Sequence, residues 1–427
     1  MKLRLFAIIL VLVVGLRRRL ASVLAPALYI VVLAGCNGTP AHALSIDVDH
    51  ASALIDLPLQ IAVSGVGAGG QATVTLETVD RLGASWSSSA RFTADQQGEV
   101  QLRSQAPVSG DYSGVQPMGL FSSLHSDSIT ALPFYLPPAP TQTATITVRA
   151  GTASATRTVV RELTHTGLTV TDILPEQDGF YGEYYSLRGA TSYMPSVVVF
   201  GGSEGGLYFS ALTARMLAAH GYPSLAVAYF QAPGLPATLN NVPLEYFTKA
   251  LTWIRQQPGV DSSHVLAYGI SRGSEAALLL GANFPDLVNG VVALVPSDAA
   301  TTSAWTLNGK PVPFTSQVNQ PRPTDNPAAI FPVARIKGPL FMVCGGADRV
   351  WSSCPYSRQI GVELDAARNG YPYTLLSYPQ AGNGVGNLVP YLMAGRTGTL
   401  DGATPEANDL ARAQAWPKLL AFIGAQR

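Results

Sequence analysis

A serine in a glycine-framed turn is the residue of this chain best suited to nucleophilic chemistry. Ser271 lies within Gly269-Ile270-Ser271-Arg272-Gly273, directly after the apolar run Val265-Leu266-Ala267-Tyr268 and before the helix-forming run Ser274-Glu275-Ala276-Ala277-Leu278. A Gly-x-Ser-x-Gly turn between a buried strand and a helix exposes the serine hydroxyl at a tight bend. The pattern therefore predicts that Ser271 is the nucleophile of an acyl-transfer reaction.

A second match to the same pattern is Gly201-Gly202-Ser203-Glu204-Gly205. Its consecutive glycines let backbone N–H groups approach a ligand closely, which favours an oxyanion hole. We expect the backbone N–H of Arg272 and that of Gly202 or Ser203 to hold the oxyanion. The side chain of Arg272 is expected to form a surface salt bridge. Ser203 as the nucleophile is the alternative.

Asp348 is the candidate acid of the site. It follows the strand-like run Leu340–Cys344 in a glycine-led loop, and a serine followed along the chain by the acid is the order of α/β-hydrolases. The alternative is a solvated aspartate in a turn. Cys344 and Cys354 flank this loop, and in an oxidising compartment we expect them to form a disulfide, with two separate thiols as the alternative.

The elements that position these residues begin near Ser196, where strand-like and helix-like runs alternate. Such alternation predicts a mostly parallel sheet covered by helices on both faces, with function at the carboxyl ends of the strands. The predicted strands are Ser196–Phe200, Ser224–Tyr229, Val265–Gly269, Gly290–Val295, Leu340–Cys344 and Tyr373–Tyr378, and the predicted helices are Leu207–His220, Leu244–Gln257, Ser274–Asn283 and Glu406–Gln426. We assign residues 196–427 to this α/β domain.

The region before it has a different pattern. Residues 44–160 show short alternating runs separated by Gly, Asp and Pro, which indicates an all-β sandwich. Residues 161–195 form a linker and lead-in, with a hairpin expected around Val170–Leu187.

The amino terminus, residues 1–36, resembles a lipoprotein-type signal or anchor. Arg17-Arg18-Arg19 precede the apolar stretch Leu20–Leu33, and Leu33-Ala34-Gly35-Cys36 ends it like a lipobox. The expectation is an exported protein of the bacterial cell envelope, held to the membrane by a lipid on Cys36. An ordinary signal peptide or membrane anchor is the alternative.

Composition limits the function classes. Lys+Arg and Asp+Glu balance at 27 each, which argues against nucleic acid as a partner. Hydrophobic residues make up 47% of the chain, enough for a sizeable core. We expect no metal site and no cofactor. The expected partner is a small acyl ester or acyl thioester.

The chain resembles the family of acyl-CoA thioesterases and bile acid-CoA:amino acid N-acyltransferases. The matching stretches are Ala90–Gly98, Tyr112–Leu120, Phe200–Leu207, Leu225–Phe230, the turn at Ser271, and Gly346–Trp351. The resemblance implies an immunoglobulin-like domain followed by an α/β-hydrolase domain, and a Ser, Asp, His triad that cleaves or transfers acyl groups through an acyl-enzyme.

The histidine of that triad is missing. Where the resemblance places it, after the last strand, the chain reads Pro379-Gln380-Ala381-Gly382-Asn383, and all six histidines precede Ser271. A carboxamide cannot act as general base, so Asn383 predicts crippled catalysis. Three accounts stay open: a replacement that traps substrate, a non-catalytic acyl-ligand-binding protein, or a histidine from elsewhere, with His165 as the candidate.

Overall fold

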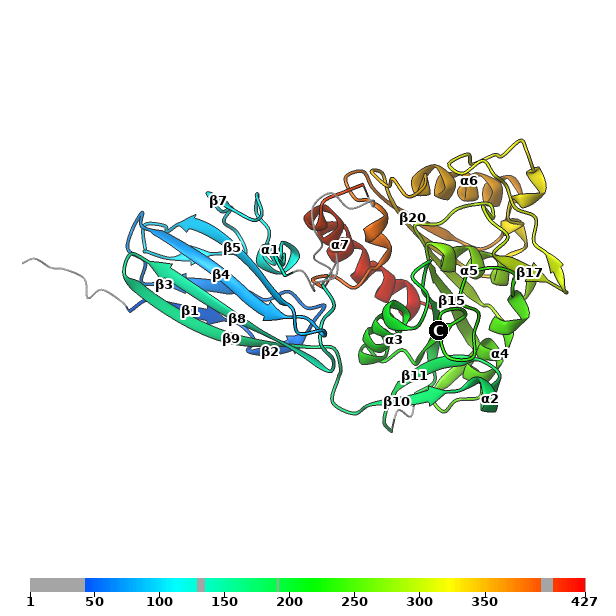
Figure 1. The fold of residues 1–427 in the computed structure, drawn as a ribbon, viewed down its shortest axis with the longest axis horizontal. Coiled ribbons are helices and arrows are strands. Elements are labelled where there is room, and N and C mark those ends of the chain that lie inside the picture. The colour runs from blue at the N-terminus through cyan, green and yellow to red at the C-terminus, as the bar shows by residue number, and fades with distance from the viewer. Residues whose placement is uncertain (1–42, 129–134, 190–191, 393–401, 427) are drawn as a thin grey trace, which may run out of the picture. The chain divides into compact units, whose positions relative to one another are not determined.

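The computed structural model describes residues 43–128, 135–189, 192–392 and 402–426 (Figure 1). The predicted leader and Cys36 lie outside the described residues. Among the residues that are described, no helix is both long enough and apolar enough to cross a membrane.

The amino-terminal region is a sandwich of two β-sheets. One sheet has the strand order β2-β9-β8-β4-β5-β7, and the other has the order β1-β3-β6. The elements are β1 (Ser45–Val48), β2 (Ser52–Leu54), β3 (Ile61–Ser64), β4 (Gln71–Val79), β5 (Ser85–Thr93), β6 (Val100–Gln101), β7 (Ser109–Gly110), α1 (Gly119–Ser122), β8 (Thr141–Ala150) and β9 (Ala153–Glu162). Strand β4 buries every second residue, as a strand with one face on a core does.

The carboxyl-terminal region is built on an eight-stranded sheet with the order β10-β11-β13-β12-β15-β16-β19-β20. Its strands are β10 (Leu168–Ile173), β11 (Tyr181–Leu187), β12 (Met194–Phe200), β13 (Ser224–Ala228), β15 (Val260–Ile270), β16 (Gly290–Leu294), β19 (Leu340–Gly345) and β20 (Tyr373–Tyr378). From β13 to β20 all neighbours pair in parallel, whereas β10 and β11 form an antiparallel lead-in.

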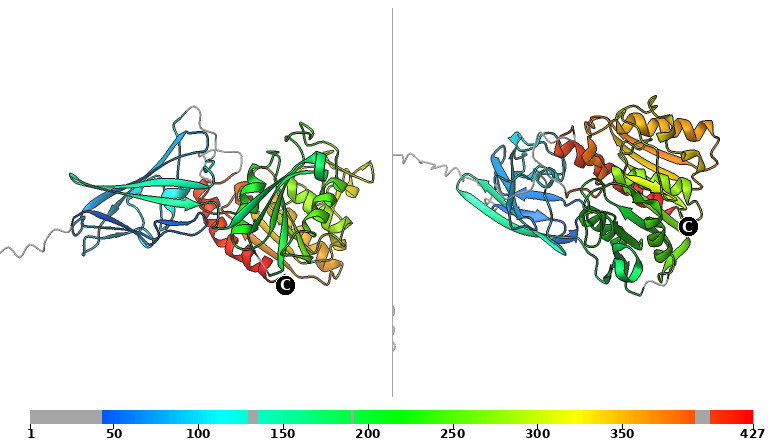
Figure 2. Two further views of the ribbon diagram at one scale, coloured as in Figure 1. Left: turned by 90° about the horizontal axis from the view of Figure 1, so that it is seen from below. Right: turned by 45° about the vertical axis from the view of Figure 1, so that its right-hand side comes forward.

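Helices cover both faces of this sheet (Figure 1), and Figure 2 shows the same layers from two further sides. One core joins the sheet to α4 (Leu244–Ile254), α5 (Arg272–Asn283) and α6 (Ser353–Ala366). The other joins it to α3 (Tyr208–Ala219) and α7 (Pro405–Gly424). The smaller elements are α2 (Pro175–Asp178), η1 (Pro327–Ala329), η2 (Val333–Arg335), η3 (Asn383–Gly386), and a three-stranded sheet of β14 (Val242–Pro243), β17 (Trp305–Leu307) and β18 (Lys310–Pro311).

The predicted fold class, a β-sandwich followed by an α/β hydrolase, is confirmed. Helix α6 is not among the predicted helices; the disulfide loop predicted for Cys344–Cys354 includes only its first two residues. Several of the residues it buries are small or polar, among them Ser353, Ser357 and Gly361, so its apolar periodicity is weak. The parallel order sets the carboxyl ends of β12, β15, β19 and β20 along one edge, which is where the candidate residues lie.

Candidate active site

Ser271 lies on a sharp turn between β15 and α5. Its backbone has φ 52° and ψ −116°, a left-handed conformation that is strained for a non-glycine residue. A Cβ atom on Gly269 would lie 2.0 Å from the carbonyl oxygen of Gly273, and one on Gly273 would lie 2.3 Å from that of Gly201. Both glycines are therefore required by close backbone packing. The turn matches the nucleophile elbow expected from the sequence.

Ser203 has none of these features. It is exposed on the loop after β12, it is not among the residues with positive φ, and α3 begins only at Tyr208. The elbow geometry thus belongs to Ser271 and not to Ser203.

The glycine loop after β12 borders Ser271. A Cβ atom on Gly202 would lie 3.2 Å from the Cβ of Ser271. The hydroxyl of Tyr229, a buried residue, donates to the carbonyl oxygens of Gly201 at 2.7 Å and Gly202 at 3.2 Å, which fixes the orientation of both peptide groups. As the first residue of α5, Arg272 has a backbone N–H without an acceptor inside the helix. Two of the expected oxyanion donors, on Gly202 and Arg272, therefore flank the serine.

Asp348 and Asn383 meet at the ends of β19 and β20. Oδ2 of Asp348 accepts a hydrogen bond from Nδ2 of Asn383 at 3.0 Å, and its Oδ1 accepts from the backbone N–H of Val350 at 2.9 Å and Trp351 at 3.3 Å. Burial raises the pKa of the Asp348 carboxyl, and these hydrogen bonds oppose that shift. Asn383 thus lies within hydrogen-bonding distance of the carboxylate of Asp348.

The short helix η3, which starts at Asn383, packs against the elbow. A Cβ atom on Gly386 would lie 3.1 Å from Cγ2 of Ile270, the residue before Ser271. Among the described residues, no hydrogen bond joins the Ser271 hydroxyl to Asn383. The structure brings Ser271, Asp348 and Asn383 to one edge of the sheet, and all three side chains are partly buried.

No described histidine is hydrogen-bonded to Ser271. Nε2 of His220 lies 2.5 Å from Oδ2 of Asp56, and Nδ1 of His264 lies 2.7 Å from Oδ2 of Asp261. His165 is exposed, and its Nδ1 lies 2.8 Å from the carbonyl oxygen of Thr166. In the part of the chain that the structure describes, no imidazole is hydrogen-bonded to Ser271 or to Asp348.

The Arg272 side chain forms a mostly buried ion pair, not the surface salt bridge expected. Its guanidinium lies 2.8 Å from Oε1 of Glu275, a fully buried residue, and 5.3 Å from the ring centre of Trp351. Oε2 of Glu275 accepts from Nε1 of Trp305 at 2.8 Å. Because Trp351 N–H also binds Asp348, this network connects the elbow to the acid loop.

Cys344 and Cys354 are joined by a disulfide. The bond links the end of β19 to the first turn of α6, on either side of Asp348. It closes a short loop around the acid and limits how far that loop can move.

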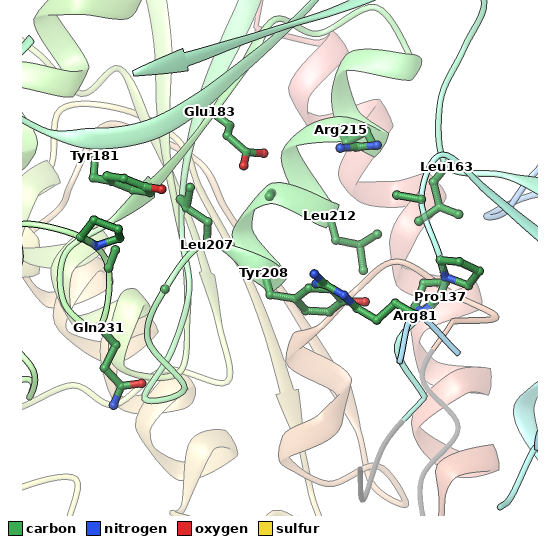
Figure 3. A pocket seen from close by; sticks show the side chains of 16 residues that line it. Arg81, Pro137, Leu163, Tyr181, Glu183, Leu207, Tyr208, Leu212, Arg215 and Gln231 are labelled. Atoms are coloured by element: carbon green, nitrogen blue, oxygen red, sulfur yellow. The ribbon is translucent and has the colours of Figure 1, made fainter. Parts of the chain in front are cut away.

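A cavity of about 620 Å³ lies next to the glycine loop (Figure 3). Its lining includes Arg81, Tyr181, Glu183, Tyr208, Arg215 and Gln231. Gly206 and Leu207, at the end of the glycine loop, also line it, whereas Ser271, Asp348 and Asn383 do not. Among the described residues neither arginine forms an ion pair; Arg81 lies over the ring of Tyr208 at 5.0 Å and Arg215 over that of Tyr185 at 5.3 Å.

Three residues of this site were missed by sequence reasoning. Glu275 ends the first turn of α5 and directly precedes the apolar run Ala276–Leu280, and a charged residue on a buried helix needs a buried partner. Tyr229 ends a predicted strand, and its sequence position does not indicate a bond to the glycine loop. Glu204 lies within Gly201–Gly205, but nothing in the sequence indicates that its carboxylate accepts the N–H of Gly202.

Comparison with known proteins gives consistent matches along the chain. The family profile described as "Acyl-CoA thioester hydrolase/BAAT N-terminal region" matches residues 56–174, and that described as "BAAT / Acyl-CoA thioester hydrolase C terminal" matches residues 242–426. Acyl-coenzyme A thioesterase 6 of Mus musculus is 26% identical over 86% of this chain and 93% of its own.

Two further Mus musculus relatives are similar to the same degree. Peroxisomal succinyl-coenzyme A thioesterase is 25% identical, with 86% of this chain and 93% of its own covered. The mitochondrial acyl-coenzyme A thioesterase 2 is 26% identical, with 87% and 86% covered. A Pyrobaculum calidifontis esterase structure is 18% identical over 60% of this chain and 86% of its own, with a TM-score of 0.40, too low to carry an argument.

These relatives correct one expectation. The sequence was interpreted as that of an exported bacterial lipoprotein, and this localisation is wrong, because the matching curated proteins are eukaryotic acyl-CoA thioesterases that include a mitochondrial and a peroxisomal enzyme. The arginines and apolar stretch before Cys36 were weighted too heavily, since short basic and apolar segments occur in several kinds of targeting sequence.

Proposed function

Since the chain belongs to the acyl-CoA thioester hydrolase and bile acid-CoA:amino acid N-acyltransferase family, we propose that it cleaves acyl-CoA thioesters with Ser271 as nucleophile. The observation that carries this proposal is the strained elbow at Ser271, with Gly202 beside it. Strain of this kind persists where function requires a side chain to be presented in one direction.

In the proposed reaction the Ser271 oxygen attacks the thioester carbonyl carbon and its proton passes to solvent water, because the carboxamide of Asn383 cannot accept it. The N–H groups of Arg272 and Gly202 stabilise the oxyanion. The carbon–sulfur bond then breaks, CoA leaves as a thiolate, and water hydrolyses the acyl-serine ester to the free acid. Because sulfur leaves as a stable anion, the leaving group needs no proton from Asn383.

The cavity of Figure 3 is the proposed site for the CoA portion. It adjoins Gly206 and Leu207, which continue the loop that carries Gly202. Arg81 and Arg215 line it, form no ion pair with any residue that the structure describes, and suit the phosphate groups of CoA.

The weak step of the proposed reaction is removal of the serine proton. Asn383 hydrogen-bonds Asp348 but has no accessible proton affinity near neutral pH. A positioned general base contributes about 10²- to 10⁴-fold in rate. We therefore expect the chain as it stands to react slowly, and Asn383→His to accelerate it by about that factor.

The test is labelling by a fluorophosphonate probe, followed as a second-order rate constant. Asn383→His should label faster than the unchanged chain, and Ser271→Ala should not label in either background. Ser203→Ala is the matched control, because Ser203 offers the same hydroxyl on the neighbouring loop without the elbow. Labelling that survives Ser271→Ala but disappears with Ser203→Ala would reverse the assignment.

A second function is favoured by the Asn383–Asp348 hydrogen bond itself. The Asn383 amide stands where the family has its histidine, and it still donates a hydrogen bond to the Asp348 carboxylate. Such an arrangement is expected of a protein that binds an acyl ligand and does not turn it over. Calorimetric binding of an acyl-CoA with no release of CoA, in both the unchanged chain and Asn383→His, would favour this binding protein over the hydrolase.

A further inference from the structure

The oxyanion donor of Gly202 already has a partner. Its backbone N–H donates to Oε1 of Glu204 at 2.8 Å. A carboxylate oxygen at this N–H carries the same charge as the oxyanion that acyl transfer would generate there.

The carboxylate also fits against the glycine surface next to the serine. A Cβ atom on Gly201 would lie 2.5 Å from Oε1 of Glu204, and one on Gly202 would lie 2.8 Å from Oε2. The same Cβ position on Gly202 is 3.2 Å from the Cβ of Ser271. Glu204 therefore fills the space that the absence of side chains on Gly201 and Gly202 leaves beside Ser271.

No cation neutralises this carboxylate within the described part of the chain. The carboxylate oxygens of Glu204 accept hydrogen bonds from backbone N–H groups, and the titratable side chain near this carboxylate is that of Tyr229. Burial of the carboxyl raises the pKa of Glu204, although part of the residue's surface stays exposed. A group held only by backbone hydrogen bonds, with a route to solvent, can be displaced without breaking an ion pair.

We propose that Glu204 is an internal occupant of the oxyanion hole, which the acyl carbonyl oxygen must displace from Gly202 before Ser271 reacts. The proposal rests on the function assigned to Ser271 above. The step exchanges one acceptor for another at a single N–H and changes no covalent bond. The resting site is consequently closed to a carbonyl oxygen that binds too weakly to replace the carboxylate.

Occupancy is tested without any chemistry at Ser271, by NMR of the whole chain labelled with ¹⁵N-glycine. The Gly202 amide proton should shift as pH crosses the Glu204 pKa, with a midpoint above that of an ordinary glutamate. Glu204→Ala should move the signal upfield and abolish the titration. Glu176→Ala, which removes an exposed carboxylate on α2, should leave it unchanged. A Gly202 signal that is the same with and without Glu204 overturns the proposal.

The consequence is tested by fluorophosphonate labelling in the Asn383→His background. Hydrogen bonds to a charged group contribute about 1.5 to 3 kcal/mol, so Glu204→Ala should accelerate labelling about 10- to 100-fold. Glu204→Gln, which keeps an acceptor but loses the charge, should give an intermediate acceleration. Glu176→Ala should leave the labelling rate unchanged. Slower labelling after Glu204→Ala overturns the proposal and identifies Glu204 as the proton acceptor of Ser271.

The two measurements separate the proposals. If Gly202 responds to Glu204 but no variant labels at Ser271, the occupied hole stands and the hydrolase function fails. If Asn383→His labels at Ser271 while the Gly202 amide signal is unaffected by Glu204→Ala, the proposed function stands and the occupied oxyanion hole is refuted.

Discussion

The hydroxyl of Tyr229 offers a direct test of how the glycine loop is held. In Tyr229→Phe the ring and its packing against Trp305 and Phe247 remain, but the carbonyl oxygens of Gly201 and Gly202 lose their shared donor. Both glycines are buried, so their carbonyl groups have little access to replacement water. The peptide group that presents the Gly202 N–H then loses its fixed orientation.

The expected losses differ for stability and for reactivity. Removing one partner of a buried hydrogen bond costs about 1 to 3 kcal/mol, which urea unfolding measures as a lower midpoint at unchanged slope. Deleting an oxyanion donor outright costs about 10²- to 10³-fold in rate, so misaligning one should slow fluorophosphonate labelling of the Asn383→His chain by about tenfold.

Tyr246→Phe is the matched control. Its hydroxyl donates to the carbonyl oxygen of Ala228 at 2.7 Å, the same distance as the bond from Tyr229 to Gly201, but it does not touch the glycine loop. Both substitutions should destabilise the chain, and only Tyr229→Phe should slow labelling. Equal labelling rates in the two variants would refute the positioning role of Tyr229.

Three further predictions follow from buried charge and from the cavity. Glu275→Gln leaves Arg272 without its buried partner and should lower the free energy of unfolding by about 3 kcal/mol, measured in urea. Burial raises the pKa of Asp298 from 3.8 to about 8. The folded chain therefore holds this proton more tightly than the unfolded chain does, and stability falls as pH rises from about 4 to 8. Asp298→Asn should make the urea midpoint depend less on pH between pH 5 and 8. Arg215→Ala should raise KM for an acyl-CoA several-fold and leave KM for a short uncharged ester unchanged. If Arg215→Ala and the unchanged chain have the same KM for the acyl-CoA, the cavity does not bind CoA.

The sheet could be predicted because its strands are buried on both faces. The strand that ends at Ile270 is apolar over its last six residues, and such runs alternating with helical segments leave little choice of architecture. The short elements could not be predicted in the same way. Strand β17 pairs with β14 and with β18 over only two residues each, and it carries Trp305, which is fully buried.

The positions of Ser271, Asp348 and Asn383 after their strands were accessible to sequence reasoning, because a parallel sheet gathers its carboxyl ends. The partners of buried charges were not. Glu204 accepts a hydrogen bond from the N–H of Gly202, two residues away, in a turn whose conformation no local sequence pattern specifies. Glu275 accepts a hydrogen bond from Trp305, which lies thirty residues further along the chain, beyond strand β16. Hydrogen bonds of these kinds depend on tertiary placement rather than on periodicity.

The distribution of the site over the sheet has a consequence for folding. Gly202, Ser271, Asp348 and Asn383 follow four different strands, and the distances between them along the chain are large. Contacts between residues so far apart in sequence are slow to form, and a fragment that lacks any one of these strands cannot complete the constellation. A probe that reacts at Ser271 would therefore report when the parallel sheet has acquired its native strand order during refolding. A measurement of total helix content would not detect this step, because helices can form before the strands are in order.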